Sequence, residues 1–234
     1  MASILGQLTD RAMRLVTRGA TVTAVEDIGP AFRRIRVDAP GASWSPGAKV
    51  QFQIEGMTLR TYTPFDWDGD AASFLLYRHG GIGPAEAWAD SLAVGDDVAV
   101  FGPRKSLSLD DLGTAPVIVG DETSFAVTAA WRGHGSAPAA ARIFEVTDVA
   151  ASTAALEALD LMPSDLVART ADDGHLGELT ERVLTSLGSN PGAPLVITGK
   201  AQTIRAVRGA VKDAGLSPTT RVKAYWDPNR AGLD

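Results

Sequence analysis

The sequence predicts a β + α/β protein of two domains: an N-terminal antiparallel six-stranded β-barrel over residues 1–110 and a parallel-sheet α/β domain over residues 111–234. Two observations favour this fold class. Short segments that alternate apolar and polar residues, with Gly and Pro between them, fill the first half. Strand-like and helix-like segments alternate in the second half, which is typical of a parallel sheet covered by helices. The pattern changes between Leu109 and Ala115, where we expect the domain boundary.

The first half contains six segments of strand character. In the clearest of them, Val50, Phe52 and Ile54 alternate with polar residues, which marks one buried and one solvated face. Turn-forming pairs such as Gly29-Pro30 separate the segments, and a closed antiparallel barrel would pair them all. A short amphipathic helix is expected before them, over residues 3–18. The expected strands are Thr21–Asp27, Ala31–Asp38, Lys49–Ile54, Thr58–Thr63, Ala72–Arg78 and Asp97–Phe101.

The second half begins with a compact apolar run, and helical periodicity follows it directly. The same succession then repeats to the end of the chain. Strands are expected over residues 116–120, 141–146, 166–170, 195–199 and 220–225, and helices over residues 124–131, 152–159, 176–187 and 201–214.

Composition excludes several classes of function. The 234 residues include 22 Lys and Arg against 28 Asp and Glu, so the net charge is −6 and no nucleic-acid partner is expected. No apolar run approaches a membrane span, and the N-terminus lacks the apolar region of a secretory signal. We therefore expect a cytoplasmic monomer without membrane insertion. The absence of cysteine excludes disulfides, thiolate zinc sites and cysteine-ligated iron–sulfur clusters, and the three widely separated histidines fit no metal-site spacing.

The stretch Arg60-Thr61-Tyr62-Thr63 places a cation, a phenol ring and hydroxyls on one expected strand. Side chains alternate along a strand, so Arg60 and Tyr62 share one face while Thr61 and Thr63 take the other. A guanidinium can fork onto a phosphate and the ring can lie on a conjugated heterocycle, which together suit a flavin dinucleotide. The alternative interpretation is an ordinary half-exposed sheet face.

A second motif runs from His79 to Trp88 and contains Gly80, Gly83, Pro84 and Ala85. Glycines let the backbone approach a ligand closely, and Pro84 is well placed as the first residue of a helix. The helix N-terminus would favour a phosphate. Alternatively, this segment is a flexible turn before a helix.

Taken together, these motifs resemble the FAD-binding half of siderophore-interacting proteins, the ferric-siderophore reductases of the ferredoxin–NADP reductase superfamily. The resemblance covers roughly residues 20 to 228. It is carried further by Gly95-Asp96, Gly102-Pro103-Arg104, Gly120-Asp121-Glu122-Thr123, Gly199-Lys200-Ala201 and Tyr225-Trp226. Three departures from the family pattern are seen. Phe65 stands where a second Arg is usual, and Ser124-Phe125-Ala126-Val127 stands where Ala-Leu-Pro-Ala is frequent. A tryptophan and a basic residue that are common near the middle of the second domain have no match around Ala168–Gly177.

The resemblance implies a role for each matching position, but no catalytic acid or base and no metal ligand. Arg60 would bind the FAD pyrophosphate, Tyr62 would stack on the isoalloxazine, and Thr63 would lie near flavin N5, with Thr61 in the same cofactor motif. The FAD ribityl and phosphate groups would be held by His79, Gly80, Gly83, Pro84 and Ala85. In the second half, Asp121 and Thr123 would line the nicotinamide side of the cleft. Tyr225 or Trp226 would close over the flavin. Lys200 and Arg205 would face an anionic substrate. The alternative interpretation of Lys200 is a solvated lysine at a helix start, and that of Arg205 is a solvated arginine on a helix, as most helix arginines are.

The resemblance implies an FAD-dependent oxidoreductase that passes electrons from NADH or NADPH to a ferric siderophore and releases iron(II). A ferredoxin-like protein is a possible alternative donor. Two other hypotheses stay open. The enzyme could reduce a different acceptor, such as free flavin, a quinone or a protein, or the chain could be a non-enzymatic module that binds flavin or an iron chelate.

Overall fold

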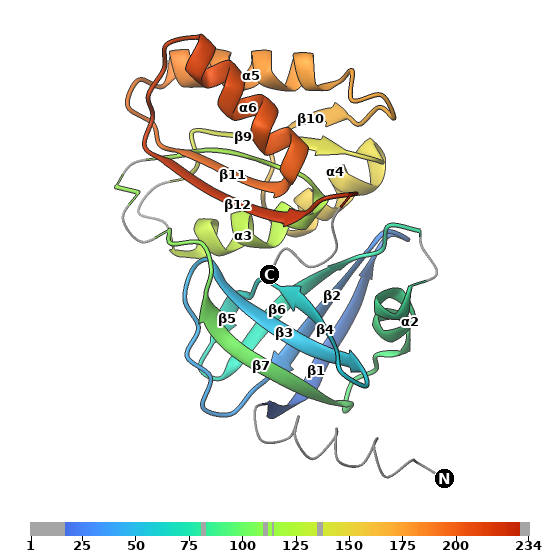
Figure 1. The fold of residues 1–234 in the computed structure, drawn as a ribbon. Helices are drawn as coiled ribbons and strands as arrows, with labels where there is room; N and C mark the ends of the chain where they lie inside the picture. Colours follow the sequence, from blue (N-terminus) through green and yellow to red (C-terminus); the bar gives the residue numbers. More distant parts are fainter. Residues whose placement is uncertain (1–16, 81–82, 110–111, 114, 135–137, 230–234) are drawn as a thin grey trace. The chain divides into compact units, whose positions relative to one another are not determined.

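The computed structural model describes residues 17–80, 83–109, 112–113, 115–134 and 138–229. The chain divides into two compact units, Met1–Ser106 and Leu107–Asp234 (Figure 1). The helix expected over residues 3–18 lies outside the described residues except for its last two, and Arg18 already belongs to the first strand. Among the described residues, no helix is both long and apolar enough to cross a bilayer.

The first unit is an antiparallel sheet of seven strands in the order β4-β3-β7-β1-β2-β6-β5. Its end strands, β4 and β5, are consecutive in the chain and are joined by Thr63-Pro64. The strands are β1 (Arg18–Ile28), β2 (Phe32–Asp38), β3 (Ala48–Glu55), β4 (Thr58–Tyr62), β5 (Phe65–Asp68), β6 (Ala71–Tyr77) and β7 (Asp97–Lys105), and the helix α2 (Pro84–Ser91) lies between β6 and β7.

The antiparallel class is confirmed, with one strand more than expected. Pro64 ends the pairing of β4, as its missing N–H requires. The chain then resumes as β5, whose Phe65 is fully buried and lies opposite Ser73 of β6. Four residues with two aspartates gave too weak a pattern to identify this strand from the sequence.

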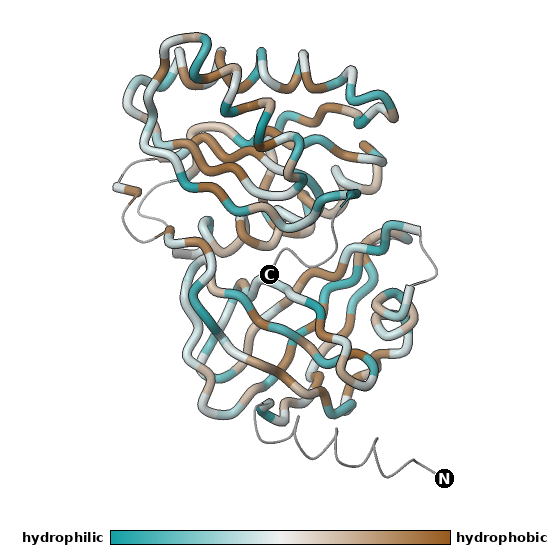
Figure 2. Tube along the Cα trace, in the orientation of Figure 1, coloured by the Kyte–Doolittle hydropathy of each residue, from teal (hydrophilic) through white to brown (hydrophobic). Residues whose placement is uncertain are grey.

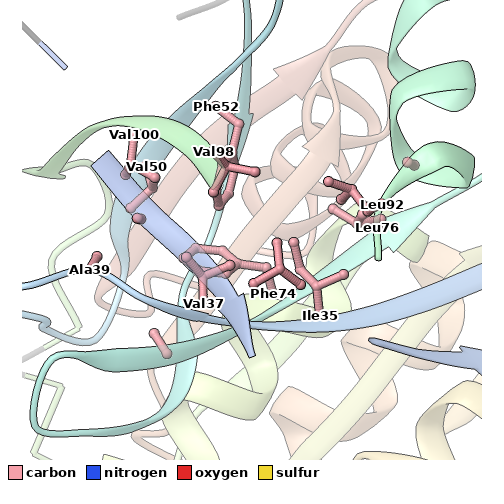
Figure 3. Packing of buried hydrophobic residues seen from close by; sticks show 14 of the residues in the cluster. Ile35, Val37, Ala39, Val50, Phe52, Phe74, Leu76, Leu92, Val98 and Val100 are labelled. Atoms are coloured by element: carbon pink, nitrogen blue, oxygen red, sulfur yellow. The ribbon is translucent and has the colours of Figure 1, made fainter. Parts of the chain in front are cut away.

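The core of this unit consists of the inward-facing side chains of its strands (Figure 3). Val50 and Phe52 are fully buried while Lys49 and Gln51 are half-buried, as the alternation predicted, but Ile54, expected on the buried face, is only half-buried. Phe52 meets Phe74 edge to face, with ring centroids 4.9 Å apart. Each such side chain contributes about 1.5–3 kcal/mol to folding when it is buried. A slip of one residue would turn these rings toward solvent, so their burial fixes the register in which the strands pair.

The second unit is a parallel sheet in the order β10-β9-β8-β11-β12, which confirms the predicted α/β class. Hydrophobic residues gather along its strands (Figure 2), and α5 and α6 pack on one face through their apolar stripes. The elements are β8 (Val117–Gly120), the 3-10 turn η1 (Glu122–Ser124), α3 (Phe125–His134), β9 (Ala141–Val146), α4 (Val149–Ala158), β10 (Asp165–Ala168), α5 (Leu176–Ser189), β11 (Leu195–Lys200), α6 (Ala201–Asp213) and β12 (Thr220–Trp226).

The order of strands positions a site. The chain moves outward from β8 through β9 to β10, and then returns to the other side of β8 with β11 and β12. Sheets of this kind bind ligands at the carboxyl ends of the strands where the order reverses. In this unit those ends are Gly120 of β8 and Lys200 of β11.

Candidate functional site

The predicted flavin motif lies on β4, the end strand of the first unit. Arg60 lies opposite Phe52 of β3, and Tyr62 lies opposite Val50. Arg60 is exposed, and among the described residues it makes no ion pair; its Nη1 donates to the Leu59 carbonyl at 2.9 Å. Thr61 and Thr63 are half-buried. The strand therefore offers an exposed guanidinium on the same face as a phenol ring.

Tyr62 links this strand to α2. Its ring centroid lies 6.3 Å from that of Trp88 in a stacked arrangement, and 5.8 Å from that of Phe52. Burial raises the pKa of the Tyr62 phenol to about 12, so the ring is neutral at physiological pH. Because Trp88 belongs to α2, the contact brings the β4 motif next to the glycine-loop motif, as a shared cofactor would require.

The N-terminus of α2 has the predicted form. Gly83 is the N-cap, Pro84 follows at the first helical position, and no side chain caps the first turn. Gly80 has φ of +79°, a conformation that favours glycine, and a Cβ at Gly80 or Gly83 would meet no atom within 4 Å. The open backbone and the uncapped helix dipole suit an external phosphate. His79 is exposed, with its Nδ1 3.3 Å from Glu86 Oε1 in the first turn of the helix.

The opposite end of α2 is held by ion pairs of the sheet. Arg33 Nη1 donates to the carbonyls of Ala89, at 2.6 Å, and Asp90, at 3.0 Å. Asp27 accepts from Arg33 and also from Arg78, at 2.7 Å, and the hydrogen bond from Arg33 helps to lower the pKa of Asp27 to about 2. Arg78 is thereby committed to the scaffold, and Arg60 is the cation of the motif left for a ligand.

These features fit FAD. An exposed guanidinium, a stacking ring and an uncapped helix N-terminus are the donor set that a flavin dinucleotide needs, and the Tyr62–Trp88 contact places them in one neighbourhood. Arg60, Tyr62, Gly83, Pro84 and Ala85 would hold the cofactor. Residues 81 and 82 of the glycine loop lie outside the described part of the chain.

In the second unit, Asp121 joins the carboxyl ends of three strands. Its Oδ1 accepts from the Thr123 N–H at 2.9 Å, and its Oδ2 accepts from the Lys200 N–H at 2.9 Å and from Trp226 Nε1 at 2.7 Å. The carboxyl group is fully buried, and this burial raises its pKa to about 6. Four residues predicted for the nucleotide side or the substrate are thus brought together.

The glycines of this edge make room for the protein's own polar groups. A Cβ at Gly120 would lie 2.2 Å from Ser124 Oγ, and a Cβ at Gly199 would lie 2.4 Å from Asp121 Oδ2. Ser124 Oγ accepts from the Asp121 N–H at 3.2 Å, which completes a capping box. The N–H groups of Asp121, Thr123 and Ser124 in the first βα turn are therefore bonded within the turn.

Arg169, which follows β10, was missed by sequence reasoning. Its Nη2 lies 2.9 Å from Glu122 Oε2, its Nη1 donates to Thr147 Oγ1 at 2.7 Å, and its guanidinium carbon lies 5.6 Å from the Trp226 ring. Glu145 is the second carboxylate of this network, with Oε2 3.6 Å from Arg169 Nε. A glutamate inside the apolar strand Ile143–Val146 was the available signal, because a buried charge needs a partner.

His175 completes the buried network. Its Nδ1 accepts from the Thr170 N–H at 3.2 Å, so its Nε2 carries the hydrogen that is donated to Glu145 Oε2 at 2.5 Å. The other oxygen of Glu145 accepts from Thr203 Oγ1 at 2.6 Å. Glu145, His175 and Thr203 are all buried, so this network supports the sheet edge rather than reaching a ligand itself.

Lys200 and Arg205 occupy different environments. The Lys200 side chain is only 8% exposed, and its Nζ lies 2.6 Å from Asp173 Oδ1. The Arg205 side chain is 67% exposed, with Nη1 3.9 Å from Asp227 Oδ2. Lys200 is therefore tied into the protein, and Arg205 is the more accessible cation. Arg208 lines a groove at the opposite edge of the sheet, beside the first residues of β11 and β12.

Comparison with known proteins agrees with this architecture. Residues 42–107 match the model of the siderophore-interacting FAD-binding domain. A search of curated proteins found no match. Among solved structures, the siderophore-interacting protein from Acinetobacter baumannii is 16% identical with a TM-score of 0.70, over 92% of this chain and 92% of that protein.

Two further structures extend the likeness. A siderophore utilization protein from T. fusca is 20% identical, with a TM-score of 0.67 over 93% of this chain and 95% of that one. The ferredoxin–NADP+ reductase from Plasmodium falciparum is 11% identical, with a TM-score of 0.67 over 89% and 96%. The resemblance seen in the motifs is confirmed: residues 42–107 match the siderophore-interacting FAD-binding domain, and the chain shares its fold with siderophore-interacting proteins and with a ferredoxin–NADP+ reductase.

Proposed function

We propose that this chain is an FAD-dependent oxidoreductase that passes electrons from NADH or NADPH to a ferric siderophore. The observation that supports it best is the Tyr62–Trp88 stack, which sets the Arg60 strand beside the uncapped N-terminus of α2. Both elements lie inside the stretch that matches the siderophore-interacting FAD-binding domain.

The residues of the first unit have defined tasks in this proposal. Arg60 neutralises the pyrophosphate of FAD, and the backbone at the start of α2 adds N–H donors. Tyr62, held in place by Phe52 and Trp88, presents its ring to the isoalloxazine. Bound FAD supplies the ability to accept two electrons together and to release them singly. The protein positions the ring and excludes competing orientations.

A ferric siderophore suits this chemistry because it accepts single electrons. Hard oxygen ligands hold iron(III) more tightly than iron(II), so reduction weakens the chelate and releases the metal. Ferric siderophores that carry negative charge would be attracted by an exposed cation such as Arg205.

The test begins with the colour of the protein. The purified chain is mixed with FAD, freed of excess cofactor and scanned; retained flavin bands near about 375 and about 450 nm are expected, because those bands belong to the cofactor. Anaerobic addition of NADH or NADPH should bleach them, and a ferric siderophore with an iron(II) trap should restore them.

Arg60→Ala is the matched variant for this assay. It removes an exposed cation without touching the core, so it should stay folded and lose FAD. A wild-type protein that retains no flavin would overturn the proposal, and rapid reoxidation by free flavin or a quinone, but not by ferric siderophores, would favour a different acceptor.

A further inference from the structure

The nucleotide of the proposed reaction should meet the second unit at the carboxyl ends of its strands, where the strand order reverses. The charges at that edge bear on which nucleotide fits. NADPH differs from NADH by one phosphate on the adenosine ribose, and nucleotide folds that accept it place an arginine nearby.

The basic side chains at this edge already have carboxylate partners. Arg169 Nη2 lies 2.9 Å from Glu122, Lys200 Nζ lies 2.6 Å from Asp173, and Arg205 Nη1 lies 3.9 Å from Asp227. Arg169 is engaged most fully, because Glu145 and Thr147 also bind its guanidinium and its side chain is 16% exposed. A ribose phosphate would have to displace an internal carboxylate from Arg169 or Lys200, whereas Arg205, which is 67% exposed, is the most loosely paired of the three.

The backbone of the edge is equally unsuited to additional phosphate. The space that Gly120 and Gly199 leave is filled by Ser124 Oγ and by the Asp121 carboxylate. The N–H groups of Thr123 and Lys200 both donate to Asp121. The carboxylate occupies the position of an anion, so a phosphate placed there would meet repulsion instead of free donors. This holds equally for the pyrophosphate that both nucleotides carry, so the choice between them depends on the side chains around the turn.

Among the described residues of this edge, negative charge is in excess. The three cations Arg169, Lys200 and Arg205 are outnumbered by seven carboxylates, namely Asp121, Glu122, Glu145, Asp148, Asp172, Asp173 and Asp227. Asp148 and Asp172 are exposed. A ribose 2′-hydroxyl can donate a hydrogen bond to such a carboxylate, whereas a 2′-phosphate is repelled by it.

We propose that the electron donor of this protein is NADH, and that the internal pairing of Arg169 by Glu122 and Glu145 is a main reason why NADPH is disfavoured. This inference rests on the proposed function, because it specifies the nucleotide of the same reaction. It concerns nucleotide binding alone and is independent of the electron acceptor.

The experiment compares the two nucleotides on the FAD-loaded protein in two ways. Isothermal titration calorimetry measures the affinities for NAD⁺ and NADP⁺, and anaerobic stopped-flow absorbance measures flavin reduction by NADH and NADPH. We expect NAD⁺ to bind at least about tenfold more tightly than NADP⁺, which corresponds to about 1.4 kcal/mol, and NADH to reduce the flavin faster at equal concentrations.

A pair of variants tests the role of Arg169. Glu122→Gln keeps an oxygen for the Thr147 N–H, which Glu122 Oε1 accepts at 2.6 Å, but removes the charge that neutralises Arg169. In this variant, the ratio of the NADP⁺ dissociation constant to the NAD⁺ dissociation constant should fall several-fold. Glu178→Gln is the control, because it releases Arg182 from an exposed pair within α5 and should leave the ratio unchanged. The thermal midpoint of each variant reports whether it is folded.

Each outcome has one meaning. Equal or tighter binding of NADP⁺ overturns the inference. If NADP⁺ binds more tightly and Arg205→Gln abolishes that preference, the 2′-phosphate is bound by Arg205. An unchanged ratio in a folded Glu122→Gln variant removes Arg169 from the explanation. If neither nucleotide binds, the proposed donor is wrong and the inference falls with it. If NAD⁺ binds selectively but no flavin is reduced, the nucleotide inference stands and the proposed function fails.

Discussion

At the scale of single residues, Asp121 accepts hydrogen bonds from backbone N–H groups at the ends of two strands. Its two oxygens bond the turn after β8, the end of β11 and the indole of Trp226. Because the group is fully buried, its pKa is about 6 rather than the ordinary 3.8. The joint between three strands is therefore sensitive to pH.

The pH dependence of stability follows from this shift. A carboxyl whose pKa is raised on folding binds its proton more tightly in the folded state, so its contribution is full below pH 3.8 and is lost as the pH rises to about 6. The free energy of unfolding of the wild type should therefore fall between pH 4 and 6, relative to Asp121→Asn, by at most about 3 kcal/mol. Urea titrations across this range measure it.

The lowered pKa values do not interfere in that window. Asp27, whose pKa is about 2, and Asp172 and Asp173, whose pKa values are also lowered, add stability that is lost as the pH falls, which is the opposite sign to Asp121. These three groups are the same in the wild type and in Asp121→Asn, so their effect cancels in the comparison. Parallel curves for the wild type and Asp121→Asn would contradict the assignment to Asp121.

Tyr62 should act through its ring and not through its hydroxyl. Tyr62→Phe keeps the contacts with Phe52 and Trp88 and should retain FAD affinity within about twofold, whereas Tyr62→Ala loses a stacking contact of about 0.5–1.5 kcal/mol and should bind about two- to tenfold more weakly. Titration of FAD fluorescence, which stacking quenches, gives both constants. Equal affinities for the Phe and Ala variants would mean that the ring does not touch the flavin.

At the scale of elements, α2 is a short helix that is fixed at one end so that its other end can stay open. Arg33 bonds the carbonyls of Ala89 and Asp90, while no side chain caps the turn after Gly83. A cation at the helix C-terminus also complements the helix dipole. Because Arg33 belongs to β2, its hydrogen bonds fix the position of α2, and with it the proposed phosphate site, relative to the sheet.

Arg33→Met should weaken FAD binding several-fold, although Arg33 is not expected to contact the cofactor. The variant loses the hydrogen bonds that hold the end of α2, and hydrogen bonds to a charged group contribute about 1.5–3 kcal/mol. Arg34→Met is the matched control on the same strand, since Arg34 pairs with Glu26 in an exposed bridge. Fluorescence titration should show a higher FAD dissociation constant for the first variant alone. A similar effect in both variants would point to general loosening of the barrel.

How much of this could be predicted from the sequence depends on the range of the interactions involved. The β4 motif, the loop before α2 and the strand–helix alternation are local patterns, and each was found near its predicted place. Arg169 was missed because its partners Glu122 and Glu145 become neighbours only through the order β10-β9-β8. Lys200 was correctly placed at a strand end, but its pairing with Asp173 follows from tertiary packing.

At the scale of the whole molecule, the chain consists of two units that each have a core of their own. The proposed FAD residues lie in the first unit and the proposed nucleotide edge lies in the second. A ligand that binds the folded form of one unit stabilises that unit by mass action. The two ligands should therefore act on different parts of the unfolding transition.

Calorimetric scans with and without FAD test this division. At an FAD concentration near 100 times the dissociation constant, the first unit should gain about 2.7 kcal/mol of stability, and the temperature of its unfolding transition should rise by several degrees.

Tryptophan fluorescence during heating identifies which unit unfolds. Trp44, Trp67 and Trp88 lie in the first unit, and Trp131 and Trp226 lie in the second. Replacing Trp131 and Trp226 by Phe leaves reporters for the first unit, and these should follow the FAD-dependent transition. Arg60→Ala should cancel the shift, because FAD then dissociates. A single transition that FAD moves as a whole would instead show that the two units unfold as one cooperative body.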